Sequence, residues 1–112
     1  MPRALETVTG TVTYRLRIAL TPEAVVQVEL RDVSRQDVEA PLIAKQVITR
    51  PGQVPVTFAL DYDPEAILPG HLYAVSARIE DRGQLAFVTD APVPVITGGA
   101  PTSAEIIVAP LR

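Results

Sequence analysis

Apolar and polar residues alternate along most of the chain, and a period of two is the pattern of half-buried β-strands. Shorter apolar runs also occur, and turn residues bound each of them. The pattern predicts strands at residues 7–20, 25–33, 42–48, 54–60, 72–81, 85–89, 95–97 and 104–108. In the longest run one parity is apolar: Val8, Val12, Tyr14, Leu16, Ile18 and Leu20.

Glycine and proline mark the places where strands turn or lose a neighbour. Gly83 supplies the positive φ that a hairpin turn at residues 81–84 needs. Pro55 cannot donate a backbone hydrogen bond, so we expect its strand at a sheet edge. Gly10 interrupts the apolar face of the first strand, where we expect a bulge or a bend. Residues 34–40 have neither period, which indicates a loop.

Seven or eight short strands, with turn signals about every 8 to 14 residues, predict an all-β fold. We expect an immunoglobulin-like two-sheet β-sandwich, with a closed barrel as the main alternative. Tyr73 follows a turn with the spacing of a tyrosine corner, which favours the sandwich. The length of 112 residues fits one domain, so we predict a tail at residues 1–6 and a single domain at residues 7–112.

The composition excludes several classes of protein. The net charge is −3, and no run of basic residues offers the stripe that nucleic acid requires. The arginines that could form a local positive patch are Arg15, Arg17, Arg31, Arg78 and Arg82. No apolar run approaches the roughly 20 residues of a transmembrane helix. The chain has no Cys, so disulfides and thiolate chemistry are excluded, and its first six residues lack the apolar segment of a signal peptide.

The residues needed for nucleophilic catalysis do not occur in a recognisable arrangement. The only histidine, His71, lies between a turn and a strand, where we expect it to face solvent. Ser34, Ser76 and Ser103 are the available serines, and none lies in a Gly-x-Ser-x-Gly elbow. We therefore predict no enzymatic activity, no catalytic residues and no cofactor.

Asp61, Asp63 and Glu65 have the alternate spacing that begins a calcium-binding loop. The pattern then fails, because Ala66 replaces the turn glycine and Leu72 replaces the bidentate acid. The favoured interpretation is that Asp63 caps a short helical turn with proline at its first position. A cation site that also uses Asp81 or Asp90 stays open.

Aromatic residues make up only 4% of the chain, which argues against a sugar-stacking platform. Most of the rings have inward parity, so Tyr62 is the one ring that we expect to be exposed. Residues 98–101 contain two glycines but no lysine, and they precede a strand rather than a helix, unlike a phosphate-binding loop.

Six segments of the chain resemble the YbaY/YscW family of bacterial envelope lipoproteins, which includes the secretion chaperones called pilotins. They are VTGTVTYR at 8–15, VELRDVS at 28–34, GQVPVTF at 52–58, YDP at 62–64, YAVSARI at 73–79 and TGGAPT at 97–102. The resemblance implies a β-sandwich held to a membrane by an N-terminal lipidated Cys, and pilotin members that bind a secretin subunit and assist its outer-membrane assembly. It also implies a location in the bacterial periplasm or at the outer membrane. If no signal peptide precedes Met1, we expect the cytoplasm instead.

The leading hypothesis is a non-enzymatic module that binds a protein partner through a strand edge or a groove. Residues 54–60 and 95–97 are the candidate edges. A small-ligand or carbohydrate-binding module is the alternative, using Tyr62 and the acidic loop at residues 61–70. A purely structural, self-associating domain is a third hypothesis.

Overall fold

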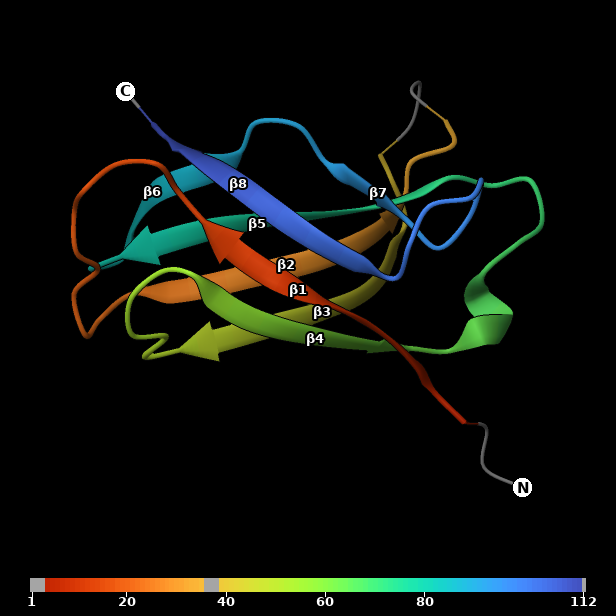
Figure 1. Cartoon of the computed structure of the whole chain (residues 1–112), viewed down its shortest axis with the longest axis horizontal. Helices are drawn as coiled ribbons and strands as arrows, with labels where there is room; N and C mark the ends of the chain where they lie inside the picture. The colour runs from red at the N-terminus through yellow and green to blue at the C-terminus, as the bar shows by residue number, and fades with distance from the viewer. Residues whose placement is uncertain (1–3, 36–38, 112) are drawn as a thin grey trace.

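The computed structural model describes residues 4–35 and 39–111, and Figure 1 shows their arrangement. Strands dominate, and a single 3₁₀ turn interrupts them between β4 and β5. No helix in these ranges is long and apolar enough to cross a membrane. The elements are β1 Glu6–Thr13, β2 Val25–Asp32, β3 Leu42–Thr49, β4 Val56–Tyr62, η1 Pro64–Ala66, β5 Tyr73–Asp81, β6 Gln84–Thr89, β7 Val93–Val95 and β8 Ser103–Pro110.

All of these strands belong to one mixed sheet in the order β3-β2-β5-β6-β8-β1-β4, with β7 paired to β5 beside this path. The strand β1 is antiparallel to β4 and parallel to β8. The two end strands, β3 and β4, come round to face each other. Across this seam the Ala59 amide donates a hydrogen bond of 3.0 Å to the Gln46 side-chain carbonyl. The sheet is therefore nearly closed into a barrel.

The predicted two-sheet sandwich of immunoglobulin type is wrong. A sandwich requires two separate sheets, but β6 pairs with β8 and β8 pairs with β1, which joins the two halves without a break. The alternation of apolar residues is the same in both architectures, since each strand has one inward and one outward face. Strand alternation alone therefore could not separate them.

The core consists of the inward parity of the strands. Val26, Val28 and Leu30 on β2 are fully buried, as the alternation predicted. Tyr14 and Phe87 stack with their ring centroids 4.4 Å apart. The predicted inward set of β5 is also confirmed, since each member is buried: Tyr73, Val75, Ala77 and Ile79.

The first strand is shorter than predicted, because it ends at Thr13 rather than Leu20. The Tyr14 hydroxyl donates to the Ile18 carbonyl and closes the following residues into a loop. Leu16 and Ile18 are consequently 47% and 54% exposed, although their parity predicts burial. Leu20, where the loop returns, is buried.

Gly10 does not form the predicted bulge. Its register with β4 and β8 is continuous, opposite Phe58 and Ala104. A Cβ at this position would lie 1.8 Å from the Ala104 carbonyl oxygen, so the glycine is required for close packing of strands.

Two other local predictions have different outcomes. The hairpin turn at residues 81–84 is confirmed, with positive φ at Arg82 and Gly83. The strand predicted at residues 95–97 is β7, which lies two residues earlier and includes Pro94. Ile96, with φ of 74°, turns the chain away from β5. The predicted loop at residues 34–40 falls partly on residues 36–38, outside the described residues.

Candidate functional site at the β5–β7 groove

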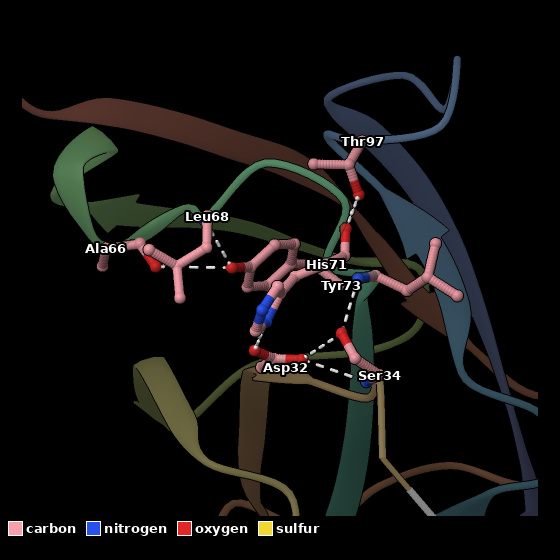
Figure 2. A network of polar contacts seen from close by, with 8 residues as sticks. Asp32, Ser34, Ala66, Leu68, His71, Tyr73 and Thr97 are labelled. Atoms are coloured by element: carbon pink, nitrogen blue, oxygen red, sulfur yellow. Dashed lines mark hydrogen bonds and ion pairs between the residues drawn. The ribbon is translucent and has the colours of Figure 1, made fainter.

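A polar network joins the end of β2 to the loop that enters β5, as Figure 2 shows. Asp32 is its centre. Its Oδ1 accepts hydrogen bonds from the Ser34 amide at 3.0 Å and the Ser34 hydroxyl at 2.6 Å. Its Oδ2 lies 2.6 Å from Nδ1 of His71. An aspartate that bonds the backbone two residues later is a common turn device, so the local sequence Asp-Val-Ser builds half of the network by itself.

Backbone groups tie this network to two further loops. The Leu72 amide donates to the Ser34 hydroxyl at 2.8 Å, and the Val33 amide donates to the Leu72 carbonyl at 2.8 Å. The Thr97 hydroxyl donates to the His71 carbonyl, also at 2.8 Å. The loops after β2, before β5 and after β7 are thus held in one fixed arrangement.

Tyr73 stabilises the same loop from inside the barrel. Its hydroxyl accepts from the Leu68 amide at 2.8 Å and donates to the Ala66 carbonyl at 3.4 Å. The predicted tyrosine corner is therefore confirmed, although it belongs to a barrel rather than a sandwich. It fixes the backbone just before His71.

The network is electrostatic as well as geometric. Hydrogen bonds from the Ser34 hydroxyl first, and from His71 second, lower the pKa of Asp32 from 3.8 to about 2. Asp32 is therefore ionised at neutral pH. The Ser34 hydroxyl donates to this carboxylate rather than to the histidine, so the order of a serine nucleophile and its base is not present.

A groove of about 240 Å³ lies beside the network, between the start of β5 and β7. Its walls are mainly apolar, and Leu72 on its rim is 55% exposed. An apolar groove of this kind can bury an apolar group. A smaller cavity of about 160 Å³, which Asp32 and His71 help to line, lies close by. The groove residues are Val33, Leu72, Tyr73, Ala74, Pro92, Pro94 and Thr97.

The acidic residues singled out in the sequence serve separate structural roles. Asp63 caps η1 by accepting from the Glu65 amide at 2.9 Å, as predicted. Asp61 accepts from the Thr7 hydroxyl at 2.7 Å. Asp81 lies at the opposite end of the barrel, where it accepts from Thr21. Within residues 4–35 and 39–111, no group of three or more His, Cys, Asp or Glu could hold a metal ion.

One side-chain prediction is wrong. Tyr62 is only 2% exposed, because it continues the inward parity of β4, and its hydroxyl donates to Glu6 at 3.0 Å. Burial, followed by this hydrogen bond, raises the pKa of Tyr62 to about 12. The alternative of a carbohydrate-binding site required Tyr62 as an exposed ring for stacking, and the buried Tyr62 cannot serve in this way. The side chain of His71 is 40% exposed, in agreement with the prediction that it faces solvent, and it is in addition bound to Asp32.

The arginines of the candidate patch do not share one sheet face, because three lie in loops at one end of the barrel and two lie on strands. Arg15 and Arg17 lie on the β1–β2 loop, and Arg82 lies in the β5–β6 turn. Arg31 is bound to Glu29 near the other end of β2, and Arg78 on β5 donates to the Gln27 side chain. Two of the candidate serines lie outside the polar network. Ser76 lies on β5, and Ser103 is the first residue of β8.

Comparison with known proteins now identifies the family. Residues 3–108 match the family described as type III secretion system lipoprotein chaperone (YscW). The chain belongs to this family. The resemblance predicted from strand and turn motifs is therefore confirmed.

Two relatives of this YscW-family chain are informative. It is 35% identical over 106 residues to the uncharacterized lipoprotein YbaY of Escherichia coli K12, covering 94% of this chain and 55% of the relative. The chain thus spans about half the length of that curated relative. It also superposes on an alternative pilotin from the type II secretion system of Vibrio cholerae, with a TM-score of 0.93 and 44% identity, covering 97% of this chain and 99% of the other.

Proposed function

We propose that this chain is the partner-binding domain of a pilotin-like lipoprotein. It binds a secretin, the outer-membrane subunit of a secretion complex, and assists its assembly in the bacterial envelope. The observation that carries this proposal is the similarity to the Vibrio cholerae pilotin, at 44% identity over nearly the whole of both chains. Identity at this level, together with the YscW family match, favours a shared kind of partner.

The proposed docking place is the β5–β7 groove. Its rim carries the exposed side chain of Leu72, and its floor includes Ala74. Aliphatic and proline walls exclude water from an inserted apolar side chain, which gives a partner favourable burial. The groove includes Thr97, from the candidate edge at residues 95–97.

The other candidate edge, at residues 54–60, is a true edge because β4 ends the sheet order. It is less available than the groove, since the Ala59 amide is already bonded to Gln46 across the seam. The loops beside the groove, in contrast, are tied together by hydrogen bonds within the chain. A partner that docks there therefore meets loops that are already ordered, which lowers the entropic cost of association.

The proposed role is binding rather than catalysis. Asp32 separates the serine hydroxyl from the histidine, so the polar network orders loops instead of activating a nucleophile. Family membership among lipoprotein chaperones supports a place in the envelope, on the periplasmic side of the outer membrane.

The test is the binding of purified, detergent-solubilised secretin from the same cell to this immobilised domain. Leu72→Ser should weaken binding by roughly tenfold, from the lost burial of an apolar side chain. Leu85→Ser is the matched control, because Leu85 is 41% exposed on β6 and is not a groove residue. If both variants weakened secretin binding equally, the groove would not be the docking place. If the unaltered domain did not bind the secretin, the proposed function would be refuted.

A further inference from the structure

Charged residues divide the barrel into a basic end and an acidic end, which the net charge of −3 conceals. At the basic end the β1–β2 loop, the β3–β4 turn and the β5–β6 turn come together, on the left in Figure 1. Arg15, Arg17, Arg50 and Arg82 lie here, against the three carboxylates of Glu23, Glu80 and Asp81. At the other end the described acidic residues are Glu6, Asp32, Glu39, Asp61, Asp63 and Glu65, against two described arginines, Arg31 and Arg35.

Two of the three carboxylates at the basic end are engaged, and the third, Glu80, is half-buried on β5. Asp81 accepts hydrogen bonds from the Thr21 amide and hydroxyl. Glu23 lies 3.6 Å from Arg82. Within the described part of the chain, the guanidinium groups of the remaining three arginines have no carboxylate partner: Arg15, Arg17 and Arg50. Their charge is therefore available to an external anion.

Apolar side chains are exposed between these charges. Residues 15–19 are all exposed, and their order is arginine, leucine, arginine, isoleucine and alanine. Leu16 is 47% exposed and Ile18 is 54% exposed. Exposed aliphatic side chains flanked by cations are typical of a surface that lies in the headgroup region of a membrane.

The loop that carries this sequence is held at both of its ends. Tyr14 at its start stacks on Phe87 and donates its hydroxyl hydrogen to the Ile18 carbonyl. At the far end, the Leu20 amide donates to the side-chain carbonyl of Gln53 at 2.9 Å, and the Gln53 amide donates to the Leu20 carbonyl at 3.0 Å. The exposed residues are therefore presented by a fixed loop, so little ordering entropy is lost when they make a contact.

A cleft lies beside this loop, between Leu20 and the β3–β4 turn. Its volume is about 490 Å³, and its lining includes Arg50, Gln53 and also Glu23, whose carboxylate lies 3.6 Å from Arg82. An open cleft with a guanidinium group on its wall can admit a phosphate-bearing headgroup. The cleft thus extends the cationic surface from the loop to the neighbouring turn.

We propose that the basic end docks on the surface of an anionic phospholipid bilayer, with Leu16 and Ile18 entering the headgroup region. The arginines meet the lipid phosphates, and the acidic end is directed away from the membrane by repulsion. For a family of lipoproteins this contact is a second membrane signal, and two weak signals together give stable anchoring. Glu6, at the start of β1, lies at the acidic end of the barrel. A lipid attached on the N-terminal side of Glu6 would reach the same bilayer only through a connecting segment as long as the barrel. The long axis is 41 Å, which corresponds to about 12 residues of extended chain.

The experiment is sedimentation of the purified domain with two kinds of vesicle, phosphatidylethanolamine alone and the same lipid with about one quarter phosphatidylglycerol. The domain should bind the anionic vesicles only, and high salt should release it. The variant Arg15→Gln/Arg17→Gln should bind about 25-fold more weakly, because each cation near an anionic surface contributes about fivefold. The variant Leu16→Ser/Ile18→Ser should bind roughly tenfold more weakly.

The matched control is Lys45→Gln/Arg78→Gln, which removes the same charge from exposed positions on β3 and β5. It should bind as the unaltered domain does, and circular dichroism melts confirm that each variant is folded. Equal binding to neutral vesicles, no binding to anionic vesicles, or equal loss in the control would overturn the proposal. The proposal would also be overturned if Arg15→Gln/Arg17→Gln bound vesicles normally but bound the secretin more weakly. That result would show that the basic end binds a protein and not a membrane. Leu72→Ser should retain vesicle binding, which separates this proposal from the proposed function.

Discussion

Replacing Asp32 by asparagine tests whether its charge holds the groove loops together. The substitution keeps the size of the side chain and one carbonyl oxygen that can accept from Ser34. It removes the negative charge that Ser34 and His71 stabilise through contacts of 2.6 Å. We expect Asp32→Asn to lower the free energy of unfolding at neutral pH and to loosen the loop before β5.

The magnitude follows from the pKa of Asp32. A change from 3.8 to about 2 corresponds to about 2.5 kcal/mol. His71 is 40% exposed, so solvent screens part of this interaction, and we expect about 1 to 1.5 kcal/mol. The folded-state pKa lies below the unfolded value, so this stability is present at neutral pH and is lost as the pH falls from about 5 to 2.

The assay is urea unfolding of both proteins at several pH values from 7 down to 2.5. The difference in unfolding free energy should be largest at pH 7 and should approach zero at the acid end. Asp90→Asn, at an exposed position in the β6–β7 connection, is the control and should change stability by less than about 0.5 kcal/mol. A difference for Asp32→Asn that stays constant over the whole pH range would refute the electrostatic reasoning.

Three further substitutions test other parts of the structure. Gly10→Ala places a Cβ 1.8 Å from the Ala104 carbonyl oxygen, so we expect a loss of at least about 3 kcal/mol in urea unfolding or no folded protein, and an unchanged midpoint would contradict the strand packing. Tyr73→Phe removes the hydroxyl that accepts from the Leu68 amide, and its melting temperature should fall by an amount equivalent to about 1 to 2 kcal/mol, whereas an unchanged melt would argue against the tyrosine corner. Tyr62→Phe should reduce the phenolate absorbance that develops near pH 12 in a spectrophotometric titration, leaving the contribution of Tyr14, whose pKa burial also raises, and an unchanged titration would contradict the assignment.

The alternation of residues predicted which side chains are buried far better than it predicted which strands are neighbours. Val28 and Ile79 had to face the core because their strands alternate, and both are fully buried. The pairing of β8 with β1 in parallel depends on contacts between residues about 95 positions apart, such as Thr9 and Ser103. No local pattern records such a contact, and the sandwich was wrong for that reason.

The functional features divide in the same way. The Asp-Val-Ser turn at Asp32 was not predicted, although its local sequence is typical of such a turn, whereas the contact of Asp32 with His71, 39 positions away, has no local signal. Tyr62 could have been predicted as buried, because it continues the parity of Phe58 and Leu60 on β4. Leu16 is the opposite case, since a local hydrogen bond from the tyrosine two residues earlier converts apparent strand alternation into an exposed loop.

The central claim is that this YscW-family chain assists a secretin in the envelope, and the most direct measurement is the assembly state of the secretin in cells. Outer-membrane fractions of cells with and without the protein that contains this chain should be compared for secretin multimers. We predict that the multimers are depleted in its absence and are restored by the unaltered protein but not by Leu72→Ser. Multimers that are equally abundant in the outer membrane of both strains would contradict the claim.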